Sequence, residues 1–121
     1  SFRDLIRTAK WPGAMRLWAS EPFPFVSEWR FFVRRGKVVG VGHYKGDPLL
    51  YPDASVVRAA IDDYSGEAPV AFGIDFGVVE AGGTYLVEVN DGFSLGCLGL
   101  GPLAYSGFLE DRWKQLVGAA A

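Results

Sequence analysis

The chain has 121 residues, which corresponds to a single small domain spanning residues 1–121. Half of the residues are hydrophobic and 15% are aromatic, so the chain can bury a core, which argues against disorder. A net charge of −2 gives no basis for broad electrostatic attraction to nucleic acid or to an anionic membrane. Cys97 is the single cysteine, so an intrachain disulfide and a cysteine-based zinc site are excluded and a cytoplasmic location is expected. No apolar run reaches the length of about 18 residues that a membrane span needs.

The N-terminal part of the chain is predicted to form three short elements. Residues 2–10 have the apolar spacing of an amphipathic helix, which the Trp-Pro-Gly sequence at 11–13 ends. Residues 15–19 suit a short strand. Residues 21–24 (Glu-Pro-Phe-Pro) are predicted to be a rigid connector, because each proline removes a backbone donor.

A hairpin is predicted next. Residues 28–34 are rich in aromatic and β-branched residues, and residues 38–45 return beside them after a tight turn at 35–37. Glycines in the returning strand indicate close approach by another backbone or by a ligand.

A helix follows the hairpin, capped by Asp53 or Ser55 and ending near Tyr64. Its side chains predicted to face the core are Val56, Val57, Ala60 and Ile61.

The rest of the chain is predicted to add a second hairpin and a final helix. The hairpin has strands at 70–79 and 84–89 and a turn at 82–83. A glycine-rich loop at 90–101 then leads to a helix at 103–117. The apolar side of this helix is predicted to carry Leu109, Trp113 and Leu116. This order predicts an α+β fold, in which an antiparallel sheet made of two hairpins packs against helices.

Three oxygen-bearing side chains fall on the second hairpin. Glu88 and Asn90 are two residues apart, so strand alternation places them on one face, together with Leu86. A turn at 82–83 would bring Asp75 opposite a residue near Asn90, on the same face. Two carboxylates and an amide are ligands that suit Mg²⁺ and leave coordination positions for phosphate oxygens and water. The alternative is that these polar side chains form only the solvated face of a sheet.

These residues resemble a known motif. Glu88-Val-Asn90 is similar to the Glu-x-Asn motif of ATP-grasp enzymes, and Asp75 lies thirteen residues before Glu88, a spacing common in that superfamily. The resemblance implies that Asp75, Glu88 and Asn90 bind the Mg²⁺ ions that bridge the phosphates of ATP.

A second segment extends the resemblance. Glu21, Phe23 and Glu28 match the hinge and following strand of the superfamily, where an acid opens the hinge, the backbone holds the adenine edge and a second acid reaches the ribose. The chain is most similar to a small clade of short, poorly characterised ATP-grasp proteins. The motifs that carry this likeness are Glu28-Trp-Arg30, Asp75-Phe-Gly77 and Glu88-Val-Asn-Asp91.

The resemblance implies part of an ATP-dependent ligase that activates a carboxylate as an acyl phosphate, which an amine or a thiol then attacks. Glu21, Phe23 and Glu28 would frame adenosine, and Arg30 would act as the catalytic residue that holds phosphate oxygens. The expected partners are a small-molecule carboxylate and an amine-type acceptor, with neither nucleic acid nor membrane, and a homodimer is allowed.

Residues 1–121 are expected to be the C-terminal part of an ATP-grasp domain. The first half of such a domain, with its phosphate-binding lysine and glycine-rich loop, is missing from the sequence, so the isolated chain is expected to be inactive. The alternative is a non-catalytic α+β interaction domain or a degenerate ATP-grasp remnant.

Other polar residues each allow two interpretations. Arg30 could instead form a surface salt bridge with a nearby acid. His43 and Lys45 could meet phosphate, but a solvated strand end is the better prediction. Ser94 lies in the loop 90–101, which either lines the acceptor site, as in ATP-grasp relatives, or is a flexible connector.

The remaining large or reactive side chains are assigned to the interior. Cys97 is predicted to be a buried small hydrophobe, because no basic neighbour in sequence would activate its thiol. Trp29 and Trp113 are predicted to lie in the core.

Overall fold

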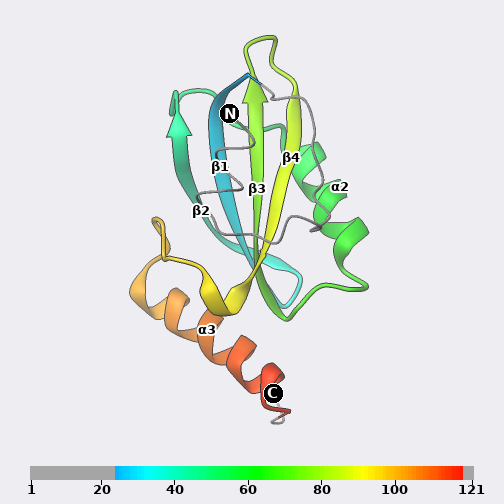
Figure 1. Ribbon diagram of the computed structural model, residues 1–121, viewed down its shortest axis with the longest axis vertical. Coiled ribbons are helices and arrows are strands. Elements are labelled where there is room, and N and C mark those ends of the chain that lie inside the picture. The colour runs from blue at the N-terminus through cyan, green and yellow to red at the C-terminus, as the bar shows by residue number, and fades with distance from the viewer. Residues whose placement is uncertain (1–23, 119–121) are drawn as a thin grey trace, which may run out of the picture.

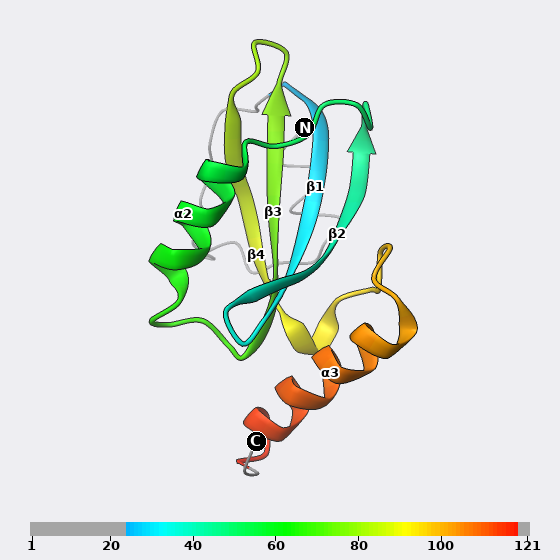
Figure 2. The same cartoon turned by 180° about the vertical axis from the view of Figure 1, so that it is seen from behind.

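The computed structural model describes residues 24–118, which form a four-stranded antiparallel sheet with one helix against a face and another across an end (Figures 1 and 2). The strand order is β2-β1-β3-β4, so each hairpin supplies half of the sheet. The strands are β1 (Phe25–Arg34), β2 (Lys37–Gly46), β3 (Ala71–Val79) and β4 (Thr84–Asp91). The helical elements are α2 (Ala54–Tyr64), the short 3-10 turn η1 (Gly92–Ser94) and α3 (Pro102–Leu116). The predicted α+β class with two hairpins is confirmed.

The N-terminal predictions lie outside the described residues. They include the helix at 2–10, the strand at 15–19, and the candidate adenosine residues Glu21 and Phe23. In the described part of the chain, neither α2 nor α3 has the length and apolar character needed to cross a membrane.

Asp53 starts α2, as predicted. Its carboxylate accepts hydrogen bonds from the backbone N–H of Ser55 at 2.8 Å and from the Ser55 hydroxyl at 2.6 Å, which satisfies a free donor of the first turn. Val57 and Ile61, one turn apart, are buried against the sheet. Val56 is exposed, contrary to prediction, because the buried stripe of α2 runs through positions 57, 60, 61 and 64.

The sheet buries side chains on both faces. On the face covered by α2, the buried core comprises Phe31, Val33, Val57, Ile61, Phe72, Ile74 and Phe76 (Figure 2). On the opposite face, a second core comprises Phe32, Ala71, Leu95, Leu100 and Phe108. Consecutive residues of β1 and β3 therefore alternate between two packed layers, which explains why β3 is buried along nearly its whole length.

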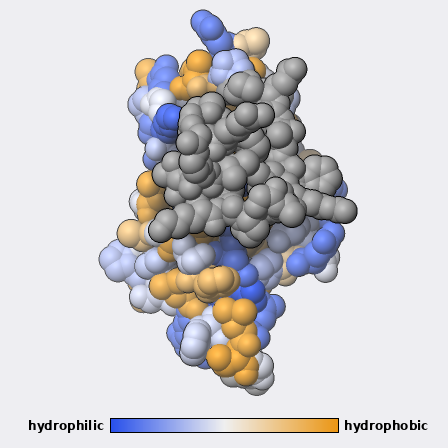
Figure 3. Space-filling model, in the orientation of Figure 1, coloured by the Kyte–Doolittle hydropathy of each residue, from blue (hydrophilic) through white to orange (hydrophobic). Residues whose placement is uncertain are grey.

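The buried side of α3 differs from the prediction. Phe108 and Asp111, three residues apart, are the buried residues of this helix, whereas Trp113 is 64% exposed and Leu116 is also exposed. The prediction that Trp113 lies in the core is therefore wrong. Asp111 turns inward because Arg34 and Arg35 neutralise it, through hydrogen bonds of 2.6 and 2.9 Å to Oδ2. Figure 3 shows apolar surface around α3, the exposed part being Leu103, Trp113, Leu116 and Val117.

The second hairpin turns earlier than predicted. The backbone N–H of Gly82 bonds to the carbonyl of Val79 at 2.8 Å, and Gly82 has a φ of +93°, which glycine adopts without strain. The turn therefore comes before residues 82–83, and Asp75 pairs with Glu88 rather than with a residue near Asn90.

A bulge in β4 changes which residues share a face. The register shifts between the pairs Asp75–Glu88 and Phe76–Leu86, so one residue of β4 is left over. Leu86 consequently lines a hollow with Val89 and the α2 residue Ala60. The prediction that Leu86 shares a face with Glu88 is wrong for this reason.

Candidate functional site

Arg30 and Asp75 form a two-pronged ion pair on the sheet face opposite α2. They are neighbours across β1 and β3, and Nε and Nη2 of Arg30 donate to the two carboxylate oxygens, each at 2.8 Å. Their side chains are only 12% and 7% exposed. The hydrogen bond to Asp75 raises the pKa of Arg30 above its ordinary value. Because both charges are largely removed from water, each depends on the other for stabilisation.

Glu88 and Asn90 lie beside this pair on β4. Glu88 is the cross-strand neighbour of Asp75, and its Oε1 is 3.9 Å from Nη2 of Arg30. Asn90 donates from its side-chain amide to the same Oε1 at 3.2 Å. The Glu88 side chain is 55% exposed, so it remains open to a ligand. The structure thus brings Asp75, Glu88 and Asn90 together on one face.

Two more side chains border the site on its β2 side. The guanidinium of Arg30 lies 5.4 Å from the centre of the Tyr44 ring, a distance at which a cation is attracted to the ring face. Glu28, two residues before Arg30, is the strand neighbour of Lys45 on β2 and of Gly77 on β3. Glu28 therefore lies on the same face as Arg30, where the prediction for the ribose acid requires it.

The side chains of the site provide hard oxygen ligands that fit Mg²⁺. Within residues 24–118 there is no group of three or more His, Cys, Asp or Glu side chains suited to a metal, so the amide of Asn90 would have to complete a set with two carboxylates. Each Asp75 oxygen accepts one hydrogen bond from Arg30, and a carboxylate has about four acceptor positions, so Asp75 keeps capacity for a cation. Mg²⁺ commonly takes one or two protein carboxylates and completes its shell with water and phosphate oxygens.

The loop that follows β4 packs onto the same sheet face. A side chain at Gly42 would collide with the backbone carbonyl of Leu98, and one at Gly73 would collide with the Leu95 side chain. The hydroxyl of Tyr105 donates to the Leu95 carbonyl at 2.6 Å, which ties the loop to α3. The glycines of β2 thus serve close backbone approach, as predicted, and the loop is an anchored segment rather than a flexible connector.

Replacing Gly42 with alanine should destabilise the protein by about 1–3 kcal/mol, because the new Cβ has no room beside a backbone atom. Urea unfolding of the full-length protein would measure this. Gly96→Ala is the matched control, because Gly96 belongs to the same loop and a Cβ there would have nothing within 4 Å. Equal stability of the two variants would contradict the packing of this loop on β2.

Several residues considered from the sequence lie away from this site. The imidazole of His43 packs edge-on against Trp29, with ring centres 4.9 Å apart, and its Nε2 is buried without a hydrogen-bond partner among the described residues. Trp29 packs half-buried against the core under α2, close to the prediction. Cys97 is exposed, so the prediction of a buried thiol is wrong; the leucines of its loop fill the core instead.

Comparison with protein families decides the assignment. Residues 1–108 match the model of an ATP-grasp domain family, the second family of its clade. The chain belongs to this family. The suspected ATP-grasp membership is therefore confirmed, and with it the general class of ATP-binding, ligase-type domain. No curated protein matches the chain.

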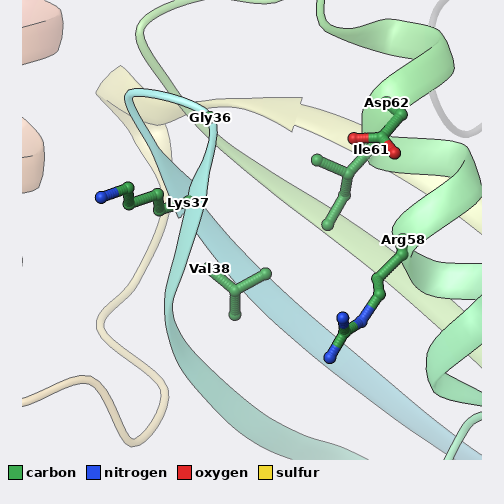
Figure 4. A pocket seen from close by; sticks show the side chains of 6 residues that line it. All are labelled: Gly36, Lys37, Val38, Arg58, Ile61 and Asp62. Atoms are coloured by element: carbon green, nitrogen blue, oxygen red, sulfur yellow. The ribbon is translucent and has the colours of Figure 1, made fainter.

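The ATP-grasp motif residues and the hollows beside α2 lie on opposite faces of the sheet. One hollow is lined by Gly36, Lys37, Val38, Arg58, Ile61 and Asp62. Figure 4 shows Arg58 and Ile61 reaching from α2 towards the β1–β2 hairpin, while Lys37 points away. This hollow contains none of the residues that match ATP-grasp motifs.

Two contacts of this ATP-grasp domain were not predicted from the sequence. Tyr44 lies at an irregular position of β2, where simple alternation does not place it over Arg30. Arg112 binds Asp91 from 21 positions away, and a single sequence shows no signal for such a pair. Asp91 itself stands directly after the Glu-x-Asn motif, which marks it as a residue worth examining.

Proposed function

We propose that the sheet face carrying Asp75, Glu88 and Asn90 binds ATP together with Mg²⁺ in an ATP-dependent ligase. The observation that supports this most directly is the joint placement of these three side chains beside Arg30, in a chain that belongs to the ATP-grasp domains. When bound, Mg²⁺ would draw charge from the phosphate oxygens and so favour phosphoryl transfer.

Arg30 has two tasks in this proposal. Its Nε and Nη2 hold Asp75 in one orientation, which keeps a metal-binding carboxylate in place. Its Nη1 is the part of the guanidinium that we propose to meet a phosphate oxygen or the acyl phosphate. The contact with Tyr44 restricts the motion of the guanidinium and so favours one geometry.

The reaction that we propose is ligation of a carboxylate to an amine or a thiol. A carboxylate oxygen of the substrate would attack the γ-phosphorus of ATP, ADP would leave, and the nucleophile would then displace phosphate from the acyl phosphate. Glu28 is proposed to contact the ribose, since it shares the site face two residues from Arg30. Glu21 and Phe23, outside the described residues, are proposed to complete the adenosine site.

Glu88 is the residue with which to test this proposal, because its side chain is 55% exposed and its loss should leave the fold intact. ATP with Mg²⁺ at about a hundredfold over the dissociation constant should stabilise the full-length protein by about 2.7 kcal/mol. Glu88→Gln should abolish most of this gain, because the variant removes one negative ligand of the cation. Thermal unfolding with ATP and Mg²⁺ together, and with each alone, would measure the gain.

Glu110→Gln provides the matched control. Glu110 is similarly exposed, at 61%, but it lies on α3, where it pairs with Lys114 at 2.7 Å. This variant should respond to ATP and Mg²⁺ as the wild type does. Absence of any response in the wild type would contradict the proposed function and favour the non-catalytic interaction domain. A full response in Glu88→Gln would contradict the assignment of this residue.

A further inference from the structure

One ion pair connects α3 to the last residue of β4. Nε and Nη2 of Arg112 donate to the two carboxylate oxygens of Asp91, each at 2.6 Å. The two side chains are 13% and 28% exposed, so the pair is largely shielded from solvent. The hydrogen bond from Arg112 lowers the pKa of Asp91, which keeps the carboxylate ionised. This is the geometry in which an arginine fixes both the position and the orientation of a carboxylate.

The surroundings of this pair hold it in place from several directions. Asp91 also accepts a hydrogen bond from the backbone N–H of Phe93 at 3.3 Å, which begins the turn η1. On the other side, Gln115 accepts hydrogen bonds from Nη1 of Arg112 at 2.7 Å and from the backbone N–H of Val70 at 2.9 Å. Arg112 thereby links the end of β4, the start of the loop and the residue that precedes β3.

Asn90 has little other lateral support. It precedes Asp91 on β4, which is an edge strand with β3 as its one neighbour in the described sheet. Its partner across β3 is Gly73, which has no side chain to hold the amide. The position of the Asn90 side chain therefore depends on how firmly the end of β4 is held.

We propose that Arg112 is a positioning residue for the site: by clamping Asp91, it holds Asn90, and through Asn90 the carboxylate of Glu88, in the geometry that receives Mg²⁺ and ATP. This inference rests on the proposed function. Arg112 touches none of the three metal-binding candidates in this role and acts through the backbone between positions 90 and 91. It resembles the outer residues of metal sites, whose loss weakens metal binding although they contact no metal.

A second ion pair on α3 offers a matched control. Arg34 binds Asp111 at 2.6 Å and connects the helix to the end of β1. Arg34→Gln should therefore loosen α3 without releasing β4. Any difference between Arg112→Gln and Arg34→Gln reports on the end of β4 rather than on the general stability of the helix.

The test compares Arg112→Gln with Arg34→Gln in the full-length protein, by two measurements. Without ligand, amide hydrogen exchange at residues 88–91 should become about tenfold faster in Arg112→Gln and change by less than about twofold in Arg34→Gln. With ATP as the probe, the Mg²⁺ concentration for half-maximal binding should rise about tenfold in Arg112→Gln and less than about twofold in Arg34→Gln. Asp91→Asn, which keeps the shape of the side chain, should show an intermediate effect and serves if Arg112→Gln does not fold.

Each outcome decides between distinct statements. Wild-type protein that binds ATP without any dependence on Mg²⁺, or does not bind it, contradicts the proposed function and this inference with it. Wild-type binding that depends on Mg²⁺, together with equal Mg²⁺ requirements in Arg112→Gln and Arg34→Gln, overturns the positioning role alone. Faster exchange at residues 88–91 with an unchanged Mg²⁺ requirement also overturns it, because it shows a structural clamp that the site does not use.

Discussion

Asp75→Asn is expected to lower the free energy of unfolding by about 3 kcal/mol, because it leaves the charge of Arg30 unpaired in a largely water-free position. The asparagine amide would also turn a donor towards the guanidinium, so that one of the two hydrogen bonds is lost outright. Denaturant unfolding of the full-length protein would measure the change. The expected loss is independent of any ligand, because the ion pair exists in the protein alone.

The partner substitutions make this prediction specific. Glu88→Gln removes a carboxylate from the same face but should change stability by no more than about 1 kcal/mol, because that side chain is mostly exposed and 3.9 Å from Arg30. Arg30→Met combined with Asp75→Leu should recover much of the loss, since neither charge then remains without its partner. An Asp75→Asn protein as stable as Glu88→Gln would show that the pair contributes nothing to the fold.

This difference separates two roles within the candidate site. Asp75 is both a proposed metal ligand and the counter-ion of Arg30, so its substitution changes fold and binding together. Glu88 is a proposed ligand with little part in the fold. Experiments on binding should therefore begin with Glu88, and results with Asp75 variants need a stability measurement beside them.

Phe108→Ala is expected to cost about 3–5 kcal/mol, because its ring is fully buried and packs edge-on against Phe32, with ring centres 5.7 Å apart. The cavity left behind would lie in the core beneath the loop that follows β4, which also contains Leu95 and Leu100. We therefore expect the loop and α3 to loosen together. Denaturant unfolding would give the loss, and hydrogen exchange would show whether it extends to the loop.

Trp113→Ala is the control on the same helix. Trp113 is the larger residue, but it is 64% exposed, so its removal should change stability by no more than about 0.5 kcal/mol. The apolar pattern of α3 in the sequence predicts the opposite order of effects. A greater loss from Trp113→Ala than from Phe108→Ala would show that α3 packs through the side predicted from the sequence.

The sequence by itself determined the elements and the motif. Runs of β-branched and aromatic residues, the turns between them and the Asp53 cap placed both hairpins and α2 within a few residues of their bounds in the structure. The spacing of Asp75, Glu88 and Asn90 placed all three on one face, because strand alternation is a local property of the chain. The family assignment also followed from residues that can be read in order along the chain.

Only the tertiary structure decided how these elements meet. The bulge in β4 and the earlier turn set the pairing of Asp75 with Glu88, and a shift of one residue in a strand leaves the apolar pattern almost unchanged. The buried side of α3 depends on Arg34 and Arg35, which neutralise Asp111 from another part of the chain. Ion pairs such as Arg30–Asp75 and Arg112–Asp91 join positions 45 and 21 residues apart. Such contacts arise from the packing of separate elements, and no local pattern in a single sequence encodes them.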